Sequence, residues 1–145
     1  MILPDVNVLI YAFRKEVPQH AACRGWLNQI IRGDTRFGIS PLALSALVRI
    51  TTNPRSYHAP SSLEDAFGFC EDILGQPHCQ LVEPGERHWE IFQRICRETD
   101  TRGPRITDAW YAALAIEWDC EWITLDRDFA RFPGLRWRAP ALPAR

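Results

Sequence analysis

The sequence predicts an α/β fold with a mainly parallel sheet that carries helices on both faces. The chain has 145 residues, the size of one ordinary domain, and 46% of them are hydrophobic, as in globular proteins. Short apolar runs alternate with longer segments of helical periodicity, a pattern typical of parallel strands joined by helices. We therefore expect residues 1–145 to form a single domain.

The first part of the chain predicts two strand–helix units and a helix between them. An apolar run over residues 1–4 indicates a strand that leads directly into a helix beginning after Asp5. The next helix begins near residues 18–20 and is ended by Gly33. A strand over 37–40 then precedes a helix that Ser40-Pro41 starts and Asn53-Pro54 ends, with the proline in a first turn that tolerates it.

The rest of the chain continues the alternation of helices and strands. Ser61 or Ser62 is expected to cap a helix over 63–74. A strand over 79–82 precedes an amphipathic helix over 89–96. The loop 101–105 leads to a helix over 109–116 that is apolar almost all round, with Thr107 as its expected N-cap. A strand over 122–125, a turn over 132–135 and an edge strand at 136–137 complete the prediction.

Composition excludes several classes of protein. The five cysteines form no Cys-x-x-Cys pair and include an odd member, which argues against a disulfide framework and a structural zinc site. The N-terminus lacks a charged leader and no stretch suits a membrane span, so we expect a cytoplasmic protein. The net charge of −1 is unlike that of a general nucleic-acid binder, so any contact with nucleic acid must be local.

Three aspartates from distant parts of the sequence are expected to meet at one edge of the sheet. Asp5 and Asp126 each follow a predicted strand, and open α/β sheets bind ligands at the carboxyl ends of their strands. Asp108 lies in the first turn of a helix, whose dipole should keep it ionised. Close carboxylates raise one another's pKa unless a cation lies between them. All-oxygen ligands favour Mg²⁺, with Mn²⁺ as a substitute, and a metal-activated water would hydrolyse a phosphodiester.

Each of these residues also has an ordinary structural interpretation. Asp5 could be a helix cap, Asp108 a first-turn acid and Asp126 a turn residue, so that only their combination favours a site. Asn7 is a helix cap or a residue that holds Asp5 through its amide, and Thr124 is a strand residue or a hydroxyl behind the site. Basic residues near the expected mouth are candidates for phosphate contacts, although solvated surface charge is their commoner role: Arg14, Lys15, Arg102, Arg105, Arg127 and Arg131.

Three segments resemble the motifs of PIN-domain nucleases. Residues 2–10 are similar to the opening D-x-N motif, 107–115 to the third acidic motif and 124–132 to the C-terminal acidic motif. Residues 49–55 and 87–92 make the chain look most like VapC toxins, the ribonucleases of VapBC modules. The resemblance implies a three-layer α/β/α sandwich, Mg²⁺-dependent endoribonuclease activity with Asp5, Asp108 and Asp126 as metal ligands, homodimerisation, and neutralisation by a VapB antitoxin.

One position departs from the PIN pattern. Many relatives carry a glutamate on the helix after the second strand, where this chain has Ala46. Three acids can still hold one metal, with Asp128 or a water completing the shell, so one and two metals both stay open. A degenerate PIN domain that binds RNA or its antitoxin without cutting is the alternative.

Two further classes of protein fit the sequence less well than a nuclease. A phosphatase or receiver domain on a similar sheet is disfavoured, because Asn7 stands where the phosphatase needs a second aspartate and Lys15 is the only lysine. A structural protein whose acidic cluster merely binds a cation would lose its fold, and not only its activity, when Asp5 or Asp108 is changed to asparagine.

Overall fold

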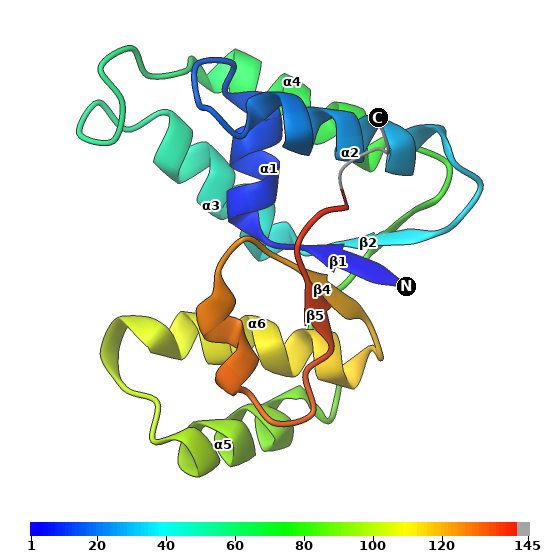
Figure 1. The fold of residues 1–145 in the computed structure, drawn as a ribbon, viewed down its shortest axis with the longest axis vertical. Helices are drawn as coiled ribbons and strands as arrows, with labels where there is room; N and C mark the ends of the chain where they lie inside the picture. The colour runs from blue at the N-terminus through cyan, green and yellow to red at the C-terminus, as the bar shows by residue number, and fades with distance from the viewer. Residues whose placement is uncertain (142–145) are drawn as a thin grey trace.

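The computed structural model describes residues 1–141 and contains a five-stranded sheet in which every pairing is parallel (Figure 1). The strand order is β3-β2-β1-β4-β5, so the chain builds outward from β1 on one side and then returns to its other side. The point where the order reverses therefore lies between β1 and β4, which is where open sheets of this kind bind ligands. The strands are β1 (Ile2–Pro4), β2 (Phe37–Ile39), β3 (Cys79–Leu81), β4 (Glu121–Ile123) and β5 (Trp137–Arg138).

Helices cover both faces of this sheet and confirm the predicted α/β/α sandwich. One layer is built from α1 to α4 and the other from α5 and α6 (Figure 1). Within the layers, α1 packs against α2 and α3, and α5 packs against α6. The helices are α1 (Val6–Phe13), α2 (His20–Arg32), α3 (Pro41–Thr51), α4 (Leu63–Leu74), α5 (His88–Thr99) and α6 (Ile106–Glu117). Two 3₁₀ turns, η1 (Gly103–Arg105) and η2 (Arg127–Arg131), precede α6 and follow β4.

The core lies on both faces of the central strands. Leu3 in β1, Ile39 in β2 and Trp122 in β4 are fully buried. Burial on both faces explains why these strands read as short continuous apolar runs and not as alternating patterns. Each large side chain removed from water in this way stabilises the fold by roughly 1.5–3 kcal/mol. The ring of Trp122 also stacks on Tyr111 of α6 at 5.3 Å, which anchors that helix to the sheet.

The structure confirms the predicted ends of two helices and the predicted state of the cysteines. Ser62 caps α4 by accepting a hydrogen bond from the backbone N–H of Asp65 at 3.0 Å, and Gly33 ends α2. All five cysteines are free thiols, buried or partly buried. Over residues 1–141, no helix is long and apolar enough to cross a bilayer.

The predicted N-cap of α6 is wrong. The helix begins at Ile106 with Arg105 as its N-cap, and Thr107 lies exposed in its first turn. The reason is the preceding η1 turn, which begins at Gly103 with a positive φ of 62° and has already brought the backbone of Arg105 to helical angles. The helix therefore starts directly from the turn, without a side-chain cap.

Gly38 is a position in the sheet where only glycine fits. A Cβ atom there would lie 2.7 Å from Cγ2 of Val82, which is itself fully buried. We expect Gly38→Ala to lower the free energy of unfolding by about 1–3 kcal/mol, the usual cost of overpacking a core. Urea denaturation measures it. Gly25→Ala is the matched control, because a Cβ atom on Gly25 meets nothing within 4 Å and alanine favours the helix. Equal stability of the two variants would contradict the prediction.

Candidate functional site

Asp5 is held at the junction between β1 and α1. Its backbone N–H donates to the carbonyl of Ile123 at 2.8 Å, which continues the pairing of β1 with β4. Its Oδ1 then accepts a hydrogen bond from the N–H of Val6 at 2.6 Å as the N-cap of α1. Only 5% of Asp5 is exposed. The capping interpretation of this residue is therefore correct, and the cap also fixes the carboxylate at the carboxyl end of the central strand.

The hydroxyl of Thr124 connects Asp5 to Asp126. It donates to Oδ2 of Asp5 at 2.7 Å, and it accepts from the N–H of Asp126 at 3.0 Å. Thr124 is fully buried and lies directly after β4. The side-chain amide of Asn7 donates to the same hydroxyl at 3.3 Å, so Asn7 reaches Asp5 only through Thr124. One hydroxyl thus sets the relative positions of two strand ends.

Asp126 and Asp128 take up different surroundings after β4. Asp126 caps the η2 turn, since its Oδ1 accepts from the N–H of Asp128 at 2.9 Å. The carboxylate of Asp128 forms an ion pair with Arg105 at 2.7 Å. Asp128 therefore pairs with Arg105. The sequence had suggested instead that Asp128 could complete a metal shell.

Burial and the charges of the neighbouring acids raise the pKa of Asp5 and of Asp108. Burial raises the pKa of Asp5 to about 6, hydrogen bonds from Thr124 and Val6 oppose the rise, and the charges of Asp108 and Asp126 add to it. Burial also raises the pKa of Asp108, and Asp126 is the next cause, while Arg105 and Arg131 act in the opposite direction. The pKa of Asp108 therefore lies above its ordinary value, because desolvation and the charge of Asp126 outweigh the groups that lower it.

The donor set suits a hard cation, but its carboxylates remain apart. Carboxylate oxygens are the ligands that Mg²⁺ prefers, and a cation would relieve the repulsion that raises these pKa values. Across residues 1–141, however, no group of three or more His, Cys, Asp or Glu side chains is already arranged to hold a metal. Ala46 of α3, at the position of the missing fourth acid, is half-buried. Since Mg²⁺ usually keeps several waters and binds through one or two carboxylates, waters would complete the shell of an ion held here.

Tyr111 is a residue of this region that the sequence did not reveal. It follows Asp108 by one helical turn, is 4% exposed, and stacks on Trp122. Burial raises the pKa of its phenol strongly, and the charges of Asp5 and Asp108 contribute, while Arg49 of α3 opposes them. Tyr111 lies three positions after Asp108, a spacing that places both on one face of a helix and could have indicated their proximity. The apolar character of the helix made Tyr111 look like an ordinary core residue.

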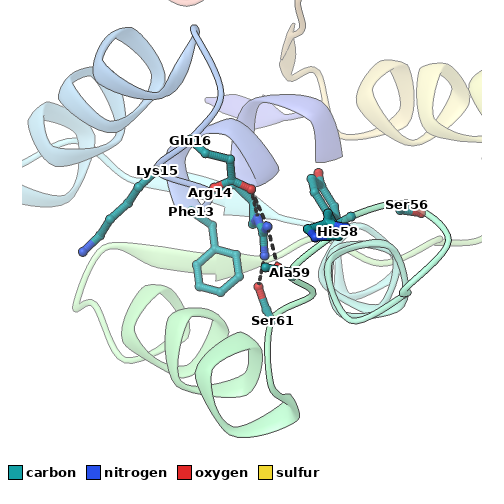
Figure 2. Close-up of a pocket in the computed structure, with 9 residues that line it drawn as sticks. Phe13, Arg14, Lys15, Glu16, Ser56, His58, Ala59 and Ser61 are labelled. Atoms are coloured by element: carbon teal, nitrogen blue, oxygen red, sulfur yellow. Dashed lines mark hydrogen bonds and ion pairs between the residues drawn. The ribbon is translucent and has the colours of Figure 1, made fainter.

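The basic residues proposed for phosphate contacts separate into two groups. Arg14 and Lys15 lie at the end of α1 opposite Asp5, where they line an open pocket of about 630 Å³. Figure 2 shows the side chains of both residues at this pocket. The guanidinium of Arg14 donates to Oγ of Ser61 and the carbonyl of Ala59, both at 2.8 Å, forms an ion pair with Glu16, and covers the ring of Tyr57. Its side chain is only 10% exposed. These contacts join the loop after α1 to the loop before α4.

The other four basic residues lie in η1 and η2 or, in the case of Arg102, directly before η1. The charges of Arg105 and Arg131 act to lower the pKa of Asp108, and Arg131 also lies over the ring of Phe132. Arg102 pairs with Asp100 on the surface, and Arg127 is exposed. The structure therefore brings Arg105 and Arg131 to the acidic site and leaves Arg14 and Lys15 away from it.

The fold and these strand-end carboxylates define a PIN domain. The PIN domain family model matches residues 2–135, and the chain belongs to that family. Ribonuclease VapC43 of Mycobacterium tuberculosis H37Rv is 39% identical, covering 97% of this chain and 95% of the relative. Ribonuclease VapC25 of the same strain is also 39% identical, over 98% of this chain and all of the relative. Within the PIN family, the chain is of the VapC type.

Solved structures agree on the fold. VapBC2 from Rickettsia felis, bound to a DNA fragment from its promoter, matches with a TM-score of 0.71 at 16% identity, covering 96% of this chain and 98% of the other. VapC20 of Mycobacterium tuberculosis, a toxin that cleaves the sarcin-ricin loop, matches with a TM-score of 0.64 at 13% identity, covering 94% and 99%. At these identities the likeness concerns the fold alone.

The raised pKa of Asp5 makes stability depend on pH. The folded chain binds more protons than the unfolded chain between the ordinary pKa of 3.8 and about 6, so the contribution of this group to stability falls as pH rises through that window. Above it, the buried charge costs on the order of 3 kcal/mol.

We expect Asp5→Asn to flatten the pH dependence of the unfolding free energy in this window. Without divalent cations, the variant should be no less stable than the parent near pH ~7, because a neutral amide replaces a buried charge. Chemical denaturation at several pH values measures both effects. A variant that is clearly less stable at neutral pH would show that the hydrogen bonds of the carboxylate outweigh the cost of its charge.

Proposed function

We propose that this PIN domain is a metal-dependent endoribonuclease that acts as the toxin of a type II toxin–antitoxin pair. The observation that carries the proposal is the junction at which Thr124 joins Asp5 to Asp126 beside Asp108. Relatives that align over nearly the whole chain are named ribonucleases, and this supports RNA as the substrate class. The reaction is hydrolysis of a phosphodiester bond.

Asp5, Asp108 and Asp126 are the residues that would hold Mg²⁺, or Mn²⁺ in its place. When bound, the ion would polarise the phosphodiester and lower the pKa of an attacking water. The protein itself positions the carboxylates. The hydroxyl of Thr124 donates to Asp5 and accepts from the backbone N–H of Asp126 and the amide of Asn7, so one side chain orients the carboxylate of Asp5 and holds the backbone of Asp126 beside it. Partners of this kind behind metal ligands typically change affinity or activity by about 10–100-fold.

An antitoxin of the VapB type and a second copy of the chain are the proposed protein partners. Several structural neighbours are VapBC complexes, including one from Salmonella typhimurium bound to DNA. Since these share only the fold, the VapC names of the relatives at 39% identity are the stronger support for an antitoxin. Light scattering of the purified chain, alone and with the product of a neighbouring small reading frame, tests both partners.

A PIN domain that binds RNA or its antitoxin without cutting is the second candidate. Two observations favour it. Ala46 removes the fourth acid of the usual motif, and the described residues show no ready-made metal group. Such a protein would still bind RNA and its partner, but Mg²⁺ would neither stabilise it nor support turnover.

Changing Asp108 to Asn separates these candidates. We expect Mg²⁺-dependent cleavage of RNA by the parent and a loss of about a hundredfold or more in the variant, the scale of losing one stabilising electrostatic group. Folding should be retained, because Asp108 is only half-buried and its carboxylate is not the cap of any helix within residues 1–141. Cleavage assays with and without chelator, with Asp72→Asn as a surface control of equal charge change, measure the effect. Equal cleavage by parent and variant would contradict the role proposed for Asp108.

Restoring the missing acid provides an independent test. If three carboxylates suffice, Ala46→Glu should change the Mg²⁺ concentration needed for half-maximal cleavage by about tenfold or less. If the chain is degenerate, the same change should create activity where the parent has none. Metal titration of the cleavage rate distinguishes these results, and a parent without activity would support the second candidate.

A further inference from the structure

A half-exposed ion pair stands at the edge of the acidic site. Nη2 of Arg105 lies 2.7 Å from Oδ2 of Asp128. Arg105 is the N-cap of α6, three residues before Asp108, and Asp128 lies in η2, two residues after Asp126. The pair therefore joins the two segments that carry Asp108 and Asp126.

The surroundings of Arg105 are acidic on several sides. Its pKa is raised first by Asp128, and the charges of Asp108 and Asp126 add to the rise. Arg131 is the other cation that acts on Asp108. Arg105 is thus a cation in contact with Asp128 and within electrostatic range of Asp108 and Asp126, two of the carboxylates proposed to act on RNA.

Breaking this ion pair costs little free energy. The side chains of Arg105 and Asp128 are 46% and 56% exposed, and pairs of that kind contribute little to stability. The contact joins one nitrogen to one oxygen, whereas a guanidinium can grip a phosphate with two parallel N–H groups. Exchanging Asp128 for a phosphate would therefore improve the contacts of Arg105.

We propose that Arg105 is an RNA-backbone contact which Asp128 occupies in the RNA-free protein, so that Asp128 competes with phosphate for the same guanidinium. The inference rests on the proposed function for the identity of the ligand. It also separates Arg105 from Arg14, whose side chain is 10% exposed and engaged by two loops, and from Arg102, which pairs with Asp100.

A double-mutant cycle on RNA binding tests the competition. Binding of a fluorescein-labelled single-stranded RNA of mixed sequence is measured by anisotropy in chelator, so that no cleavage occurs. We expect Asp128→Asn to tighten binding about two- to fivefold, the range of a surface ion pair. We expect Arg105→Gln to weaken binding and to reduce the slope of log Kd against log salt by about one. In the Arg105→Gln background, Asp128→Asn should have little effect.

Two outcomes would overturn the inference. If Asp128→Asn tightens binding equally with and without Arg105, the effect is the general removal of a negative charge. If Arg105→Gln leaves affinity and salt slope unchanged, Arg105 does not contact RNA. Asp72→Asn and Arg32→Gln, both exposed on the opposite helical layer, are the matched controls and should change affinity by less than about twofold. Because binding is measured without metal, a chain that binds in this way but does not cleave would refute the proposed function and leave this inference standing.

Discussion

The hydroxyl of Thr124 is the contact on which the arrangement of the site depends. It links residues 119 positions apart in sequence by donating to Asp5, and its other hydrogen bonds hold Asp126 and Asn7. The hydroxyl is fully buried, so each of these bonds forms away from competing water, where an unpaired polar group would be costly. The ends of β1 and β4 are thereby kept in one register at the point where the strand order reverses.

That junction also explains the electrostatic character of the site. The same packing that buries Asp5 brings Asp108 and Asp126 close enough to raise its pKa, and only the hydrogen bonds from Thr124 and Val6 oppose the rise. The fold therefore accepts a buried charge that it stabilises incompletely. A protein that served only structure would gain from a neutral residue at this position, whereas a cation-binding protein uses the unbalanced negative charge.

Positive charge is distributed around the site according to the packing of the loops. Arg105 faces the carboxylates because η1 leads directly into α6, and its partner Asp128 is placed by the turn that Asp126 caps. Asp5 and Arg14 lie at opposite ends of α1, Asp5 as its N-cap and Arg14 as its C-cap. At that far end, Arg14 donates to Ser61 and Ala59 and lies over the ring of Tyr57. Arg14 is therefore distant from Asp5 because a whole helix separates them, whereas Arg105 is one helical turn from Asp108 and stays beside it.

The sequence by itself determined the elements and the acidic motifs. Apolar periodicity, Gly33 and the serine cap of α4 were sufficient to predict the helices and strands, because these features act over a few residues. It also determined which aspartates follow strands. Only the tertiary structure decided that Thr124 joins Asp5 to Asp126, that Asp128 turns to Arg105, and that Tyr111 lies within reach of two carboxylates. These contacts depend on how distant segments pack, and even the start of α6 was decided by the turn before it and not by the capping preference of Thr107.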